Sequence, residues 1–243
     1  MKIHIIQHDR WVEPGEYLAW ANRHGYEVSM TRDWNYEQLP EEVTADFLVV
    51  LGGCMCPATT KEECSFFDAA AEISFIRRHV EAGRAVVGIC LGSQLVGEAM
   101  GAPYKHSPFS EVGPVLARLT EEGKKDPFLK GFTDPFYAGE WHNDMPGLTP
   151  DAVILAESDG CPRQIVRYGK YIYGFQTHME FTHEIISHGL ENCIEDLSLP
   201  GPYIQTKEEM LAFDYTEMNR ILSGFLDAMT EDYMRSRSLP LAP

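Results

Sequence analysis

The first hundred residues alternate short β-branched, apolar runs with segments whose apolar positions recur at helical spacing. The runs at 45–51 and 85–89 are almost continuously apolar, which is typical of strands buried on both faces of a parallel sheet. Such an alternation favours an α/β fold, with a mostly parallel central sheet and helices on both of its faces. We expect strands at 2–7, 26–30, 45–51 and 85–89, and helices at 15–24, 66–82 and 93–100.

The second half of the chain changes character, because its strand-like runs are joined mostly by turns. We expect these runs to add antiparallel strands to the sheet, with a hairpin turn at Gly169 and Lys170. The expected strands are 112–119, 136–142, 152–157, 164–168 and 171–176. Helices should follow at 182–193 and 207–233, separated by a break at 199–202, where the sequence is Leu-Pro-Gly-Pro. The second helix belongs to a helical C-terminal extension of about 200–235. Its apolar residues indicate packing against the core in the first place, and an interface with another protein as the second reading.

Length and charge limit the classes of function. A chain of 243 residues can form one domain, 1–243. Its 20 Lys and Arg against 37 Asp and Glu give a net charge of −17, which repels nucleic acid and anionic lipid. The N-terminal apolar run is too short for a secretory signal, and no segment approaches the roughly 18 apolar residues of a membrane span. We expect a cytoplasmic protein with reduced cysteines.

Cys90 lies between Gly88 and Gly92, where a β-branched strand runs directly into a helix. This Gly-x-Cys-x-Gly pattern predicts a nucleophile elbow, in which the glycines permit a sharp turn and the sulfur projects at the end of the strand. The positive end of the following helix would favour the thiolate. The alternative is a cysteine that is only a small buried apolar residue.

A histidine and two polar neighbours alternate near the end of a later β-rich run. Gln176, His178 and Glu180 are spaced to share one face of an extended segment. His178 can act as general base and acid while the Glu180 carboxylate orients its ring. Taken alone, this pattern is typical of a strand end facing solvent, but together with the cysteine elbow it favours catalysis.

Two further segments are candidates for binding substrate. Gly52 and Gly53 follow a buried strand, so their backbone N–H groups could form half of an oxyanion hole, completed by the amide of Leu91. Trp141 and His142 belong to a polar segment that could line a pocket for the backbone of an amino acid. Neither segment is specific by itself.

Together these segments resemble the class I glutamine amidotransferase family, in particular the branch related to the GMP synthase amidotransferase domain. The resemblance covers about residues 40 to 185, and its most specific motifs are Gly88-Ile-Cys-Leu-Gly-Ser-Gln94 and Gly174-Phe-Gln-Thr-His-Met-Glu180. Weaker support comes from Glu111-Val-Gly113, Trp141-His-Asn-Asp144 and Glu157-Ser-Asp-Gly-Cys-Pro-Arg-Gln164.

The resemblance implies a flavodoxin-like fold and a catalytic triad of Cys90, His178 and Glu180. It implies an oxyanion hole from the amides of Gly53 and Leu91, and a glutamine-binding role for Gln94. It further implies hydrolysis of the glutamine side-chain amide through a γ-glutamyl thioester, without a cofactor, with ammonia passing to a separate synthetase. Met179, Cys54 and Cys56 depart from the family pattern and leave open the shape of the loop over the substrate.

Other classes of protein remain as alternatives. The enzyme could act alone on γ-glutamyl amides or peptides, since the sequence has no Gly-x4-Gly-Lys-Ser/Thr loop for ATP. A non-catalytic binding module could share the fold. A metal site could use Cys54, Cys56, Cys161 and several of the histidines, although a matching second cysteine pair is missing, and we expect no bound metal. An α/β hydrolase would place its acid before the histidine, unlike the order found here.

Overall fold

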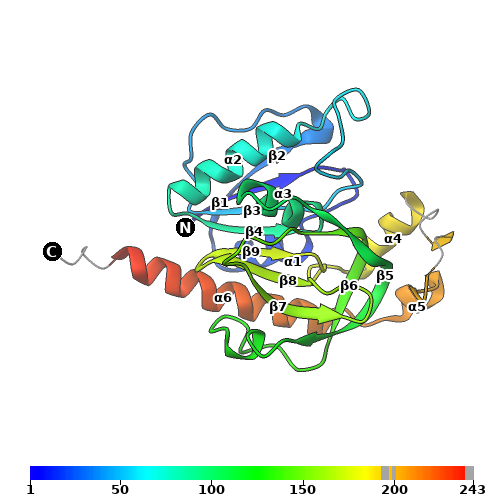
Figure 1. Ribbon diagram of the computed structural model, residues 1–243. Helices are drawn as coiled ribbons and strands as arrows, with labels where there is room; N and C mark the ends of the chain where they lie inside the picture. The colour runs from blue at the N-terminus through cyan, green and yellow to red at the C-terminus, as the bar shows by residue number, and fades with distance from the viewer. Residues whose placement is uncertain (193–196, 199–200, 239–243) are drawn as a thin grey trace.

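The computed structural model describes residues 1–192, 197–198 and 201–238, which form one mixed sheet of ten strands with helices on both faces (Figure 1). The strand order along the sheet is β10-β5-β7-β8-β9-β4-β3-β1-β2, and β6 pairs with β5 outside this path. The predicted α/β class, with a mostly parallel centre and helices on both faces, is confirmed.

The parallel half of the sheet places the ends of its central strands side by side. It consists of β1 (Lys2–Gln7), β2 (Glu27–Arg32), β3 (Phe47–Val50), β4 (Ala85–Ile89) and β9 (Ile172–Phe175). The order β2-β1-β3-β4-β9 corresponds to the flavodoxin-like arrangement. Because β3, β4 and β9 run in the same direction, the segments that follow them meet at one edge of the sheet.

The antiparallel half contains β5 (Lys105–Leu119), β6 (Phe136–Met145), β7 (Val153–Ser158) and β8 (Ile165–Gly169). All pairings among these strands, and between β8 and β9, are antiparallel, as predicted. Strand β5 begins seven residues before the expected residue 112, because its first part pairs with β6 across an irregularity in register. The two-residue strand β10 (Tyr203–Ile204), parallel to β5, was not predicted.

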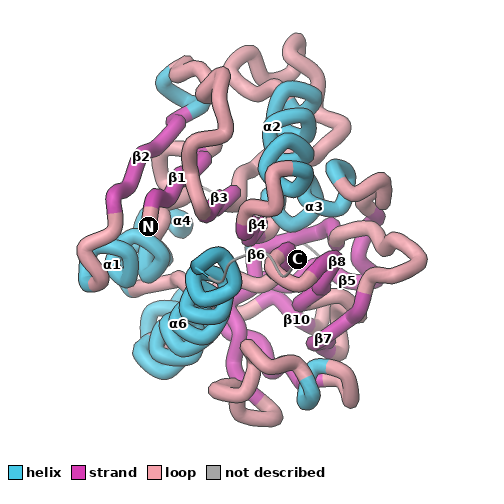
Figure 2. The backbone as a smooth tube through the Cα atoms, turned by 90° about the vertical axis from the view of Figure 1, so that its left-hand side faces the viewer, coloured by secondary structure: helices cyan, strands magenta, loops and turns pink. Residues whose placement is uncertain are grey.

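Two helices cover each face of the parallel strands. Figure 2 shows α1 (Gly15–Arg23) and α6 (Thr216–Ser238) on one side of β1, β3 and β4, with α2 (Ala69–Glu81) and α3 (Leu91–Ala99) on the other. Alternate residues of β3 belong to the two resulting cores: Phe47 and Val49 to the first, Leu48 and Val50 to the second. Burial of both faces explains why the strand sequences are continuously apolar.

Several helix boundaries differ from the prediction for local reasons. Helix α2 begins at Ala69 and not at 66, because the Asp68 side chain accepts a hydrogen bond from the Ala71 amide and caps it. Helix α3 begins at Leu91, two residues early, since Cys90 is its N-cap residue. The short 3₁₀ helices η1 (Asp33–Asn35) and η2 (Gly123–Lys125) were not predicted.

The expected helix 207–233 is two helices, α5 (Lys207–Ala212) and α6. A capping box of Thr206 and Glu209 starts α5, and the Asp214 carboxylate accepts from the Thr216 amide where α6 starts. Helix α4 (His183–Asn192) matches the expected helix 182–193, except that Cys193 lies outside the described residues, as do residues 199 and 200 of the expected break. No helix in the described ranges has the length and apolarity needed to cross a bilayer.

Candidate active site

Cys90 occupies a strained turn between β4 and α3. Its backbone has φ +50° and ψ −111°, a conformation that residues with a Cβ rarely adopt. A Cβ on Gly88 would lie 2.2 Å from the Gly92 carbonyl oxygen, and one on Gly92 would lie 2.0 Å from the Val50 oxygen. Only glycine therefore fits at either position, and the predicted elbow is present.

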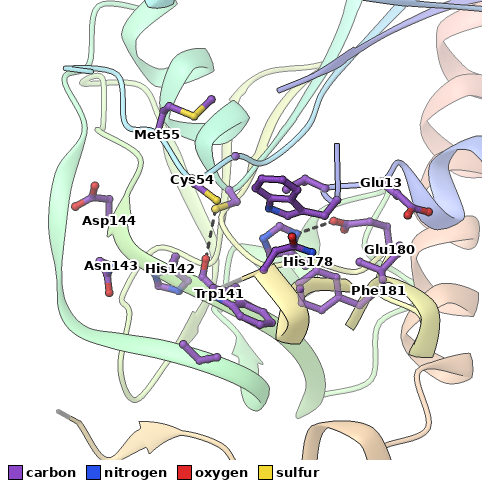
Figure 3. Close-up of a pocket in the computed structure, with 18 of the residues that line it drawn as sticks. Glu13, Cys54, Met55, Trp141, His142, Asn143, Asp144, His178, Glu180 and Phe181 are labelled. Carbon is purple, nitrogen blue, oxygen red and sulfur yellow. Dashed lines mark hydrogen bonds and ion pairs between the residues drawn. The ribbon is translucent and has the colours of Figure 1, made fainter. Parts of the chain in front are cut away.

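His178 lies beyond the end of β9, which stops at Phe175 and is shorter than the expected strand 171–176. Its backbone exchanges two hydrogen bonds with Gly139 of β6, at 2.7 and 3.1 Å. The His178 Nδ1 atom lies 2.6 Å from Glu180 Oε1, and its ring stacks on Phe181 at a centroid distance of 4.3 Å. Figure 3 shows the Glu180 carboxylate directed at the His178 ring.

The prediction that Gln176 shares one face with His178 and Glu180 is wrong. The Gln176 Oε1 atom accepts hydrogen bonds from Ser93 Oγ and Gln94 Nε2, each at 3.2 Å. Gln176 therefore supports the first turn of α3, and its side-chain hydrogen bonds go to that helix and not to His178 or Glu180.

The electrostatics of the site favour a thiolate–imidazolium pair. Burial opposes ionisation of Cys90, but a hydrogen bond from His178, the charges of His178 and His142, and the Leu91 amide outweigh it and lower the pKa of the thiol. Burial likewise lowers the pKa of His178, but the Glu180 charge and hydrogen bonds to Cys90 and Glu180 raise it to about 10. An ionised cysteine beside a protonated histidine is the reactive form of a cysteine nucleophile.

Helix α6 holds the segment that contains Glu180. The Asn219 Nδ2 atom donates to the carbonyl oxygens of Met179 and Phe181, at 2.9 and 3.0 Å, on either side of the carboxylate residue. No sequence pattern indicates this role, because Asn219 is an isolated polar residue in an amphipathic helix. Met179, at the position where the family pattern has proline, is completely buried in the apolar core.

The Gly52–Gly53 loop passes directly against the histidine–cysteine pair. A Cβ on Gly52 would lie 3.0 Å from His178 Cε1 and 3.3 Å from Cys90 Cβ. Among the residues that the structure describes, the Gly53 amide donates no hydrogen bond to the protein. The Leu91 amide is close enough to the Cys90 sulfur to lower the pKa of the thiol. Both amides predicted for an oxyanion hole are thus next to the nucleophile.

A cavity of about 500 Å³ opens above these groups, within the usual size range of small-molecule sites. Every predicted site residue lines this cavity except Leu91, whose side chain is buried in the core. Gln94 lines it, and the buried Gln94 Oε1 atom has no hydrogen-bond partner. Trp141 forms part of its wall, and the Trp141 carbonyl oxygen lies 3.7 Å from the Cys90 sulfur.

His142 lines the cavity, but its ring is held by two buried carboxylates. The Nε2 atom lies 3.2 Å from Glu111 Oε2 and 3.2 Å from Glu140 Oε2. Burial lowers the pKa of His142, but these carboxylates raise it well above its ordinary value, which favours the protonated ring. Its charge favours the Cys90 thiolate, an effect that sequence reasoning did not find.

Two buried groups of side chains have donor atoms within 4.8 Å of one another, as a metal site requires: Glu111, His142 and Cys161, and His8, Asp33 and Glu72. Each contains an imidazole–carboxylate ion pair that accounts for its composition without a metal. Of the three cysteines on which the metal alternative depended, Cys161 belongs to the first group together with His142, and Cys54 and Cys56 belong to neither. The five described cysteines form no disulfide with one another.

Comparison with known proteins identifies the family. The family model for glutamine amidotransferase class-I matches residues 18–196. The chain is 46% identical over 233 residues to the glutamine amidotransferase-like protein YfeJ of Salmonella typhimurium, covering 95% of this chain and 98% of YfeJ. It is 34% identical over 100 residues to a glutamine-hydrolyzing GMP synthase subunit of Methanococcus maripaludis, covering 40% of this chain and 51% of that protein.

Solved structures agree. The crystal structure of SMU.1228c superposes with a TM-score of 0.92 at 45% identity, over 95% of this chain and 100% of that one. A glutamine amidotransferase from Methylobacillus flagellatus shares the fold, with a TM-score of 0.83 at 24% identity, over 95% and 94% of the two chains. On the family match and the extent of these similarities, the chain belongs to the class-I glutamine amidotransferase family.

Proposed function

We propose that this protein hydrolyses the side-chain amide of glutamine, with Cys90 as nucleophile, His178 as general acid and base, and Glu180 as the group that orients the histidine. The observation on which the proposal depends is the alignment of these three groups on the wall of one cavity, with a 2.6 Å contact between His178 and Glu180. Family membership supports glutamine amide hydrolysis in general.

In the first half of the reaction the Cys90 thiolate attacks the amide carbonyl carbon and forms a C–S bond. The carbonyl oxygen becomes an oxyanion in the tetrahedral intermediate. His178 then donates its proton to the amide nitrogen, the C–N bond breaks, and ammonia leaves. A γ-glutamyl thioester remains on Cys90.

In the second half a water molecule transfers a proton to His178 and attacks the thioester carbonyl. The second tetrahedral intermediate collapses with cleavage of the C–S bond, which releases glutamate and restores the thiolate beside a protonated histidine. Glu180 stabilises the imidazolium in both halves and fixes the ring so that Nε2 faces the reacting atoms.

Both tetrahedral intermediates require donors for their oxyanion, and we assign this role to the amides of Gly53 and Leu91. Their positions beside Cys90 support the assignment. Each donor contributes about 3 kcal/mol in comparable hydrolases, mainly to the transition state. Gln94 and the Trp141 ring, which line the cavity, are assigned to binding the glutamine, and His142 to charge stabilisation beside it.

A γ-glutamyl amide larger than glutamine is the second candidate substrate. The cavity volume is in the range that accommodates drug-sized ligands, more than the side chain and backbone of one amino acid occupy. In that case the enzyme would act alone. With glutamine as substrate, a separate synthetase would receive the ammonia, as the similarity to the GMP synthase subunit supports.

The test is release of ammonia and glutamate from glutamine and from a panel of γ-glutamyl amides and peptides. We expect Cys90→Ala to abolish turnover while preserving the fold, and Cys64→Ala, outside the cavity, to retain it. Mass spectrometry of acid-quenched enzyme should find a γ-glutamyl adduct on Cys90. Absence of turnover of every compound by the wild-type protein, or normal turnover by Cys90→Ala, would contradict the proposal.

A further inference from the structure

The side chain of His8, which follows β1 directly, contacts the Gly52–Gly53 loop. Its Nδ1 atom lies 2.9 Å from the Gly52 carbonyl oxygen, and its Nε2 atom lies 2.7 Å from Glu72 Oε2 on helix α2. A carbonyl oxygen can only accept, so Nδ1 must be the donor. His8 is completely buried and Glu72 is 2% exposed, so solvent does not compete for either contact.

The next residue holds the other side of Gly53. The Asp9 Oδ2 atom accepts a hydrogen bond of 2.8 Å from the Cys54 amide. Two successive side chains at the end of β1 therefore contact the two peptide groups that flank Gly53. Asp9 is 4% exposed, so its contact is also protected from water.

Peptide geometry converts these contacts into an orientation for the Gly53 amide. The only cis peptide in the described part of the chain is Asp134–Pro135, so the Gly52–Gly53 peptide is trans. In a trans peptide the C=O and the N–H point in opposite directions. When His8 fixes the Gly52 oxygen, it also fixes the direction of the Gly53 N–H, which then points away from His8.

Packing leaves the loop little freedom to turn. A Cβ on Gly53 would lie 2.9 Å from His8 Cβ and 3.0 Å from Leu91 Cδ2, so the chain passes tightly between the two residues. On its other side the Gly52 α-carbon faces Cys90 and His178. The peptide whose direction His8 sets is therefore the one that lies against the nucleophile.

We propose that His8, supported by Glu72, and Asp9 are positioning residues for the oxyanion hole, since they hold the Gly52–Gly53 peptide with its N–H toward the substrate carbonyl. This role rests on the proposed amide hydrolysis. Neither residue touches the substrate. They act through Gly53: because the Gly52–Gly53 peptide is already oriented, its dipole does not have to turn when the oxyanion forms.

The electrostatic environment favours the doubly protonated ring that this arrangement needs. Burial lowers the pKa of His8, but the charge of Glu72 and its hydrogen bond, the charge of Asp33, and the bond to Gly52 raise it to about 9. Both ring nitrogens then donate at neutral pH, one to Gly52 and one to Glu72. The edge of the Phe67 ring packs on the imidazole and limits its rotation.

The experiment compares two amide substitutions at the same position. In His8→Asn the short side chain can place its NH₂ group near the former Nδ1 and donate to the Gly52 oxygen. In His8→Gln the longer side chain places its NH₂ group near the former Nε2 and leaves the Gly52 oxygen without a donor. We expect His8→Gln to lower kcat about 100-fold with KM changed less than about threefold, and His8→Asn to remain within about tenfold of the wild-type kcat.

Alkylation of Cys90 by iodoacetamide separates the oxyanion hole from the nucleophile. In this reaction the thiolate displaces iodide and forms a C–S bond, and no oxyanion develops. We expect the alkylation rate of both His8 variants to stay within about threefold of the wild-type rate. Asp9→Ala, which leaves the His8–Glu72 pair intact, should lower kcat about tenfold with the same unchanged alkylation.

His4→Leu is the matched control, because His4 is a buried histidine within β1 whose ring packs on Phe75 of α2 and bonds to Ser29 and Thr31 of β2, not to the loop. It should lower the unfolding temperature and leave kcat unchanged. The inference is overturned if His8→Gln and His8→Asn have equal kcat, if Cys90 alkylation falls in parallel with kcat, or if the loss appears in KM. A wild-type protein without Cys90-dependent turnover would instead refute the proposed function, and this inference with it.

Discussion

Substitution of Gly52 by alanine tests the proposed catalytic pair directly, because the added methyl group would lie between its two members. The methyl carbon would be 3.0 Å from His178 Cε1 and 3.3 Å from Cys90 Cβ. Carbon atoms pack best at about 3.5 to 4.0 Å, so the imidazole must move by about 0.5 Å. A displacement of about 1 Å costs roughly 100-fold in rate, so half of that predicts about a tenfold lower kcat.

The backbone can accept this change, since Gly52 is not among the glycines with positive φ. We expect the loss of stability to stay within about 1 to 3 kcal/mol, which thermal unfolding can measure. Gly131→Ala is the control, because a Cβ there would meet nothing within 4 Å. The assay is steady-state ammonia release from glutamine, or from the best γ-glutamyl substrate. Wild-type kcat in a folded Gly52→Ala protein would refute the placement of Cys90 and His178 as reacting partners.

Three further predictions concern charge and support. Burial lowers the pKa of His178, but the Glu180 charge raises it to about 10, so Glu180→Gln should move the alkaline limb of the pH profile of kcat/KM to lower pH. An unmoved limb would contradict the role of Glu180 in holding the protonated histidine. Asn219→Leu removes two hydrogen bonds to the loop around Glu180, so it should lower the unfolding free energy by about 1 to 3 kcal/mol and also lower kcat. Denaturant unfolding and ammonia release measure the two effects, and wild-type values for both would show that the loop does not need α6. Burial, with the charge of His79, lowers the pKa of His4 to about 4 in the folded protein. As the pH falls, His4 therefore takes up a proton in the unfolded chain first, and up to about 3 kcal/mol of stability is lost between pH 6.5 and 4. His4→Asn should flatten the measured unfolding free energy over that window, and an identical slope in the variant would refute this.

The sequence predicted those parts of the site that depend on short segments. The Cys90 turn follows from two glycines four positions apart, and the pairing of His178 with Glu180 needs only a spacing of two. The alternation of strands and helices predicted parallel strands with helices on both faces, because helical connections leave few other arrangements. Here pattern and structure agree, since each feature is fixed by residues close together in the chain.

Features that depend on distant partners were missed. Glu72 lies 64 residues from His8, and Asn219 lies 40 from Met179, so neither pair can be recognised without the strand order and the docking of α6. The first part of β5 is exposed and contains a proline, and it is extended because β6 lies beside it. The residues in this first part of β5 have no strong preference for a strand, so cross-strand pairing with β6 determines their conformation.

The contact of Asn219 with the loop around Glu180 has a consequence for the order in which the protein matures. Synthesis proceeds from the N-terminus, and segments can fold as they emerge from the ribosome. A nascent chain that ends before Thr216 already contains Cys90, His178 and Glu180, but it lacks the helix that anchors the carboxylate. Glutamine hydrolysis should therefore begin only after α6 has been translated and has docked against the loop around Glu180.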